Sequence, residues 1–155
     1  MGTTTDKRRF GGIERVYGPT AAQAFTRLHV TIVGMGGVGS WAVESLARAG
    51  VGKLTLVDGD VSEESNTNRQ CHAIQGNYGR WKAELMGERV KLINPDCEVN
   101  VITEVLEPDT MDAQLGTSDA LIDAIDTLKA KAALIAWGHK NGIFTLTSGG
   151  GAGRC

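Results

Sequence analysis

Residues 29–40 read HVTIVGMGGVGS, and this stretch decides the fold. Its first part, His29–Val33, is an apolar run with β-branched residues, which is typical of a buried strand. Residues 34–39 then have the spacing G-x-G-x-x-G. Apolar and small residues recur after the turn at helical intervals: Val38, Trp41, Ala42, Ser45, Leu46 and Ala49. A strand, a glycine turn and a helix in this order predict a nucleotide-binding unit, because phosphate binds at the helix N-terminus.

Four glycines of the turn, Gly34, Gly36, Gly37 and Gly39, are therefore candidate nucleotide-binding residues. In this pattern the first glycine permits a tight turn, the second lets phosphate approach the backbone, and the last lets helix and strand pack closely. A second apolar run ends at Asp58, 19 residues after Gly39, where a carboxylate can bind ribose hydroxyls. The pattern alone also fits a nicotinamide or flavin enzyme, and a turn with only a structural role is the remaining alternative.

Predicted strands and helices alternate along the rest of the chain. Further strands are expected at 54–57, 99–105, 120–124 and Phe144–Thr147, and further helices at 19–28, 81–93, 108–115 and Leu128–Lys140. This alternation predicts an α/β, Rossmann-like three-layer fold with a mainly parallel sheet and right-handed crossovers. We expect residues 1–18 to form an N-terminal arm, disordered over residues 1–6, and residues 19–155 to form one domain.

Composition excludes some classes of protein. The chain has 155 residues, with 16 Lys and Arg against 18 Asp and Glu, so an RNA partner would need a local basic patch. Its three cysteines show no C-x-x-C spacing, which disfavours a structural zinc site and fits a reducing compartment. No apolar run is long enough for a membrane span, and no signal-peptide core is present. We expect a cytoplasmic protein.

Three charged residues distinguish an ATP site from a dinucleotide site. A triphosphate site needs cations for the phosphates and a carboxylate for magnesium, and Arg69, Lys82 and Asp126 supply that set. Lys82 is expected in the first turn of a helix, where an anionic ligand would offset the unfavourable dipole. Singly, each has a simpler interpretation: Arg69 as a solvated loop charge, Lys82 as a surface residue and Asp126 as a helix N-cap. Their joint arrangement favours ATP and Mg²⁺ over a nicotinamide.

These residues resemble the superfamily of ubiquitin-activating and sulfur-carrier adenylyltransferases. The resemblance runs from Arg9 onward and rests on the motifs VGMGGVGS, LVDGD, SNTNRQ, GRWKAE, INP and DAID. The start RRFGGIERVYG, the stretch DAIDTLKAKAALI and the ending SGGGAG are most similar to the bacterial tRNA threonylcarbamoyladenosine dehydratases. That resemblance implies an ATP-binding adenylation domain over 19–155 that activates the threonylcarbamoyl carboxylate on a tRNA adenosine, leading to a cyclic hydantoin.

The resemblance also implies roles by position. The turn around Gly36 would hold the nucleotide and Asp58 the ribose, while Asn66 and Arg69 would contact phosphates. Lys82 would neutralise the α- and β-phosphates, and Asp126 would hold magnesium transiently. An arginine of the N-terminal segment would reach the phosphates of the neighbouring subunit in a homodimer, with Arg15 the first candidate and Arg9 the second.

Some features depart from the family or leave alternatives open. Cys71 stands beside His72, which suggests a nucleophile, although a small buried hydrophobe is the favoured interpretation. The glycine-rich ending at 149–153 leads us to expect the N-terminal part of a longer protein. One rival is an adenylyltransferase that activates the C-terminal Gly-Gly of a ubiquitin-like sulfur-carrier protein, which would then be the partner. Others are a nicotinamide-dependent oxidoreductase and a non-catalytic nucleotide-binding domain.

Overall fold

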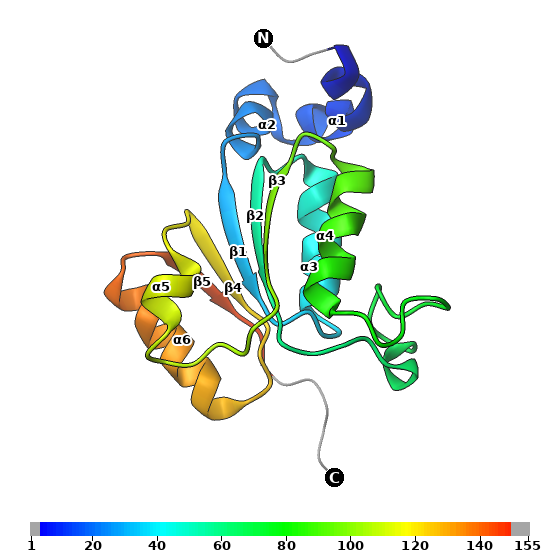
Figure 1. Cartoon of the computed structure of the whole chain (residues 1–155). Helices are drawn as coiled ribbons and strands as arrows, with labels where there is room; N and C mark the ends of the chain where they lie inside the picture. The colour runs from blue at the N-terminus through cyan, green and yellow to red at the C-terminus, as the bar shows by residue number, and fades with distance from the viewer. Residues whose placement is uncertain (1–3, 150–155) are drawn as a thin grey trace.

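The computed structural model describes residues 4–149 and contains one five-stranded parallel sheet (Figure 1). The strands lie in the order β3-β2-β1-β4-β5. Their bounds are β1 His29–Val33, β2 Lys53–Val57, β3 Glu98–Ile102, β4 Ala120–Asp123 and β5 Phe144–Thr147. All four neighbouring pairs are parallel, which confirms the predicted class of sheet.

Helices cover both faces of the sheet, which confirms the three-layer fold. They are α1 Thr4–Tyr17, α2 Pro19–Phe25, α3 Gly39–Ala49, α4 Lys82–Ile93, α5 Met111–Leu115 and α6 Leu128–Lys140, with a short 3-10 helix η1 at Glu64–Asn66. On one face α3 and α4 pack over β1, β2 and β3, and their core includes Ile32, Leu54 and Met86. On the other face α5 and α6 pack with β4, and their core includes Leu121 and Leu134.

The sheet topology determines where a ligand would bind. From β1 the chain runs outward to β2 and β3, then crosses to the other side of β1 to form β4 and β5. The strand order therefore reverses between β1 and β4, which pair from Val30 to Val33. In open parallel sheets, ligands bind beyond the carboxyl ends of the strands at such a switch point. The glycine turn leaves β1 at this position.

The N-terminal segment differs from the prediction. Residues 4–6, expected to be disordered, begin helix α1, while residues 1–3 lie outside the described part. The cause is tertiary packing at the far end of the sheet. The ring of Phe10 lies against Gly50, which ends α3 in a left-handed conformation. The guanidinium of Arg9 donates a hydrogen bond of 2.6 Å to the carbonyl of Ile93, at the end of α4. The Arg9 bond satisfies one of the carbonyls left open at the end of α4, and the Phe10 ring packs against the end of α3.

Other element boundaries also move, and the helix expected at 19–28 ends at Phe25. The third strand ends at Ile102 rather than at residue 105, because β2, its one neighbour in the described part of the sheet, ends at the paired Val57. The helix expected at 108–115 begins at Met111, after a turn in which the hydroxyl of Thr110 donates to the carbonyl of Glu107. Within residues 4–149 no helix is long and apolar enough to cross a membrane.

Candidate nucleotide-binding site

Two glycines of the turn are required by close backbone contacts. Gly34 has φ +93°, and a Cβ there would lie 2.8 Å from the carbonyl oxygen of Ala124. A Cβ on Gly39 would lie 1.7 Å from the carbonyl oxygen of Gly34. The turn therefore brings the start of α3 against the end of β1 more closely than any side chain would allow.

The middle of the turn is open. A Cβ on Gly36 would meet nothing within 4 Å, and one on Gly37 would meet the aliphatic stem of Arg69 at 3.4 Å. The carbonyl of Gly36 accepts hydrogen bonds from the Ser40 amide, at 3.1 Å, and from the Ser40 hydroxyl, at 2.6 Å. Among the described residues, the N–H groups of Gly36, Gly37 and Val38 donate no hydrogen bond. Free N–H groups at the start of an eleven-residue helix form a site for an anion.

Asp58 lies beside this turn because β1 and β2 end together, with Val33 paired to Val57. Its two carboxylate oxygens accept hydrogen bonds from the Met35 amide, at 2.6 Å, and from the Asp60 amide, at 2.8 Å. Burial raises the pKa of Asp58, while these two amides and the Lys82 ammonium act in the opposite direction. Each oxygen keeps a free lone pair, so the carboxylate can still accept a hydroxyl.

Lys82 is buried, contrary to the simple interpretation of a surface residue. It is the first residue of α4 and only 7% exposed, and its ammonium lies 3.1 Å from a carboxylate oxygen of Asp60. The Asp60 side chain is 74% exposed, so the pair opens to solvent on the carboxylate side. Asp60 is not among the site residues predicted from the sequence. The signal for it was its position in Asp58-Gly59-Asp60, two residues after the carboxylate at the end of a strand.

Asn66 ends η1 and Arg69 follows it before α4, and the two side chains differ in orientation. The Arg69 side chain is exposed and lies beside Gly37, and its guanidinium donates to the Ser65 carbonyl at 3.2 Å. Asn66 is 7% exposed, and its side-chain oxygen accepts the Glu63 amide at 3.0 Å. The structure therefore brings Arg69 to the glycine turn, while the Asn66 side chain caps its own 3-10 helix.

Asp126 follows β4 by three residues and is exposed. Its carboxylate accepts one hydrogen bond, of 3.4 Å, from the Thr127 hydroxyl. Thr127 occupies the N-cap position of α6, although its side chain makes no capping hydrogen bond. Asp126 is therefore not the helix N-cap. Between residues 4 and 149 no three His, Cys, Asp or Glu residues are grouped to hold a metal. A single free carboxylate suits Mg²⁺, which is commonly held by one or two carboxylates together with substrate phosphates and water.

The candidate arginines of the N-terminal segment lie at the opposite end of the sheet from the glycine turn. Helix α1 sits near the start of β1, whereas the turn follows the end of that strand (Figure 1). Arg9 is engaged with the end of α4 through Ile93, and Arg15 is exposed in the last turn of α1. Within one chain the structure does not bring Arg15 to the other candidate residues.

Cys71 has the properties of a structural residue. Its sulfur lies 3.5 Å from the sulfur of Met86, and burial raises the pKa of the thiol, which disfavours the reactive thiolate. The two ring nitrogens of His72 face the Ser62 hydroxyl, at 3.1 Å, and the Met35 carbonyl, at 3.0 Å. The adjacent cysteine and histidine therefore do not form a nucleophile and base.

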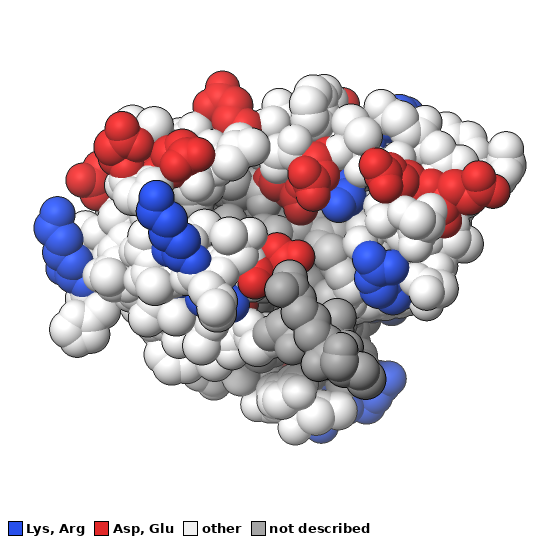
Figure 2. Space-filling model, turned by 90° about the horizontal axis from the view of Figure 1, so that it is seen from below, with Lys and Arg blue, Asp and Glu red and all other residues white. Residues whose placement is uncertain are grey.

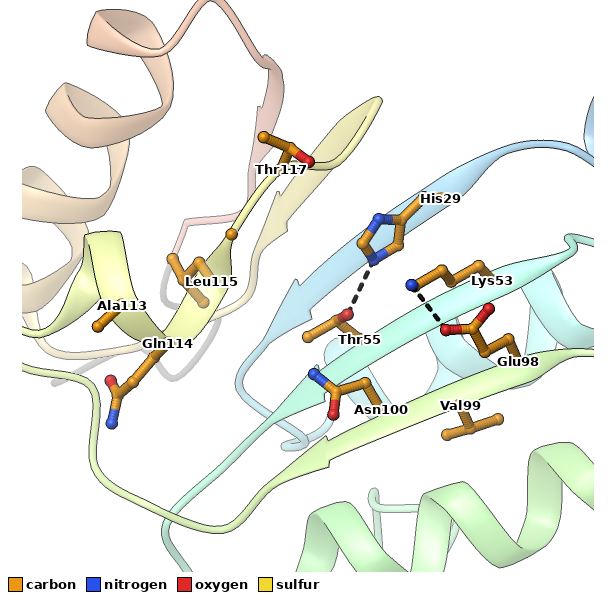
Figure 3. A pocket seen from close by; sticks show the side chains of 11 residues that line it. His29, Lys53, Thr55, Glu98, Val99, Asn100, Ala113, Gln114, Leu115 and Thr117 are labelled. Carbon is orange, nitrogen blue, oxygen red and sulfur yellow. Dashed lines mark hydrogen bonds and ion pairs between the residues drawn. The ribbon is translucent and has the colours of Figure 1, made fainter.

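The carboxyl edge of the sheet is acidic rather than basic on its surface. Figure 2 views the molecule from below and shows several groups of Asp and Glu side chains, with Lys and Arg scattered between them. A separate pocket of 520 Å³ lies at the other end of the sheet, where His29, Lys53 and Glu98 begin their strands (Figure 3). Four of its polar groups form two pairs, His29 with Thr55 at 2.8 Å and Lys53 with Glu98 at 2.7 Å.

Stability is expected to fall as the pH drops below about 6.5. Burial lowers the pKa of both His29 and His72, so the unfolded chain takes up protons there that the folded protein does not. The free energy of unfolding then decreases by up to about 1.4 kcal/mol per pH unit for the buried His72, and by less for the more exposed His29. Urea denaturation from about pH 8 to about pH 5.5 measures this dependence of the free energy of unfolding on pH. His72→Gln should reduce it, and a flat profile for the unaltered protein would contradict the assignment.

A parallel sheet with an open glycine turn at its switch point defines a nucleotide-binding domain of the Rossmann-like class. The ThiF family model matches residues 10–155, and the chain belongs to this family. Membership confirms the resemblance predicted from the motifs.

Two relatives and one solved structure show where the chain stands in the family. It is 47% identical over 149 residues to the tRNA threonylcarbamoyladenosine dehydratase of Escherichia coli, with 96% of this chain and 56% of that protein covered. The crystal structure of the E. coli enzyme in complex with ATP superposes with a TM-score of 0.95 at 45% identity, covering 99% of this chain and 63% of that one. The molybdopterin-synthase adenylyltransferase of Salmonella typhimurium is 32% identical over 109 residues, covering 70% and 44%. The chain thus spans about half the length of the curated relatives it matches.

Proposed function

We propose that this protein uses ATP to adenylate a carboxylate, namely the threonylcarbamoyl carboxylate on a tRNA adenosine. The observation that carries the proposal is the open glycine turn, with free N–H groups at Gly36 and Gly37 and with the aliphatic stem of the exposed Arg69 lying beside Gly37. The N-terminal helix dipole adds to this positive environment. An arrangement of this kind suits a polyphosphate better than it suits a nicotinamide ring.

The proposed reaction has two steps. An oxygen of the substrate carboxylate attacks the α-phosphorus of ATP, the bond to the β-phosphate oxygen breaks, and pyrophosphate leaves. The substrate's own nitrogen then attacks the acyl-adenylate carbon and loses its proton, and AMP departs with both bonding electrons, which closes the hydantoin ring. No covalent nucleophile from the protein is needed, in agreement with the raised pKa of the Cys71 thiol, which burial causes.

The residues at the carboxyl edge would lower the repulsion between the two anions. Arg69 and Lys82 would bind phosphate oxygens, for which Lys82 has to exchange its present partner, Asp60. Asp58, between Met35 and the edge of the sheet, would accept the ribose hydroxyls. Asp126 would hold Mg²⁺, which neutralises phosphate charge when bound. The side chain of Asn66 caps η1, and its proposed contribution is to hold the segment that carries Arg69.

Two further parts of the proposal concern partners. Because Arg15 lies at the far end of the sheet from the turn, it could act only on the site of a second subunit, so we include a homodimer. The tRNA substrate is supported by the name of the E. coli relative. The rival substrate is a sulfur-carrier protein activated at its C-terminal Gly-Gly. It has weaker support, because the identity to the Salmonella adenylyltransferase is 32%, against 47% to the E. coli dehydratase.

The proposal predicts exchange of labelled pyrophosphate into ATP, measured with the protein encoded by the full reading frame. Addition of threonylcarbamoylated tRNA should increase the exchange at least tenfold, because the first step needs the carboxylate and is reversible. The matched control is the same tRNA without the threonylcarbamoyl group, which should leave exchange at its basal level. Stimulation by a Gly-Gly-terminated carrier protein instead would favour the rival, and binding of NAD without ATP would reject adenylation.

A further inference from the structure

His72 holds the peptide group at the centre of the glycine turn. It is 2% exposed and lies in the segment before α4, far along the chain from the turn. Its Nε2 is 3.0 Å from the Met35 carbonyl oxygen, and its Nδ1 is 3.1 Å from the Ser62 hydroxyl. A carbonyl can only accept, so Nε2 carries the proton and donates it. Burial lowers the pKa of His72, which favours a neutral ring whose Nδ1 accepts from Ser62.

This hydrogen bond determines the direction of the neighbouring N–H group. The carbonyl of Met35 and the amide of Gly36 belong to one peptide group, and no cis peptide bond occurs in the described chain. In a planar trans peptide the C=O and N–H bonds point in opposite directions. With its carbonyl turned to the buried His72, the group must direct the Gly36 N–H away from the protein interior. The space around Gly36 is open, and this N–H has no partner within residues 4–149.

The two adjoining peptide groups are held as well. Asp58 accepts the Met35 amide, which belongs to the preceding peptide group. Ser40 donates its hydroxyl and its amide to the Gly36 carbonyl, which belongs to the following group. Three successive peptide groups of the turn are therefore fixed, and only the middle one depends on a side chain from the segment that also carries Arg69.

We propose that His72 is a positioning residue that aims the Gly36 N–H at the phosphate-bearing part of the bound nucleotide. This inference rests on the proposed ATP site. It assigns a function to a residue that touches no substrate, and it links the 62–72 segment to the shape of the turn through Ser62, His72 and Met35.

Two polar substitutions separate positioning from simple filling of the core. The amide nitrogen of His72→Gln can occupy the place of Nε2 and still donate to Met35, whereas that of His72→Asn reaches only the place of Nδ1, near Ser62. Both variants keep a hydrogen-bonding side chain in the same cavity. We expect His72→Gln to bind ATP within about threefold of the unaltered protein and His72→Asn to bind about tenfold or more weakly, since one oriented donor to a charged phosphate is lost.

The measurement is titration calorimetry with ATP on the full-length protein, with thermal unfolding of each variant as a check. Equal ATP affinity of the two variants overturns the positioning function. A second measurement needs no variant: the NMR resonance of the Gly36 amide should shift downfield when ATP is added to the unaltered protein, and an unchanged resonance in the presence of bound ATP also overturns the proposal. Failure of the unaltered protein to bind ATP at all would instead reject the proposed function, and this inference with it.

Discussion

Gly39→Ala is expected to lower the free energy of unfolding by about 3 kcal/mol or more, which is a large part of the stability of a small domain. The new Cβ would lie 1.7 Å from the carbonyl oxygen of Gly34 and 3.3 Å from the side chain of Ala124. The first of these atoms belongs to the backbone and cannot rotate away. Relief therefore requires α3 to move off the end of β1, which would disturb the core of the domain. Urea denaturation and the yield of folded protein measure the effect.

The matched control is Gly36→Ala, three residues earlier in the same turn. Its Cβ would meet nothing within 4 Å, and Gly36 does not have a positive φ. We expect its free energy of unfolding to change by less than about 1 kcal/mol. Its affinity for ATP should nevertheless fall about tenfold or more, because the methyl group occupies the space through which phosphate approaches the backbone. Equal stability losses in the two variants would contradict the steric account of the turn.

The sequence predicted this part of the molecule well, because its structure depends on local features. A β-branched strand, a glycine turn and the start of an amphipathic helix are local features, and each is visible in or just after HVTIVGMGGVGS. The limits of His29–Val33, Leu128–Lys140 and Phe144–Thr147 agree with the structure to the residue. The end of β3 was predicted less well, because it depends on where the neighbouring strand stops.

The features missed are those that depend on contacts between distant segments. Helix α1 forms where its side chains contact the ends of α3 and α4, and the sequence of residues 1–18 alone does not predict these contacts. The partnership of His72 with Met35 joins residues 37 positions apart. The burial of Lys82 was likewise not visible, because it results from packing of α4 on the sheet. Sequence periodicity can assign the elements, but it does not report which side chains face one another across them.

Lys82→Met is expected to lower the rate of tRNA-stimulated pyrophosphate exchange by about 10²- to 10³-fold, a loss typical of removing one group that stabilises developing charge. The fold should tolerate the change. The ammonium is buried at the first turn of α4, where the helix dipole disfavours a cation, and methionine fills a similar volume. Its partner Asp60 is 74% exposed and can be solvated by water when the pair is broken. We therefore expect the free energy of unfolding to stay within about 1 kcal/mol of its original value.

Lys131→Met is the matched control, because Lys131 also has a carboxylate partner among the described ion pairs and its side chain is only 13% exposed. Its ammonium lies 2.7 Å from Asp123, whose side chain is fully buried and cannot be solvated after the change. That substitution should cost about 3 kcal/mol of stability, since the buried carboxylate loses its only described cation and keeps hydrogen bonds from the Ile125 amide and the Thr147 hydroxyl. Substitution of a lysine that serves only the fold should lower stability, as for Lys131. Substitution of a lysine that binds a ligand should lower activity and leave stability unchanged. If Lys82→Met instead destabilises the protein and leaves pyrophosphate exchange intact, Lys82 belongs to the first kind and is not part of the phosphate site.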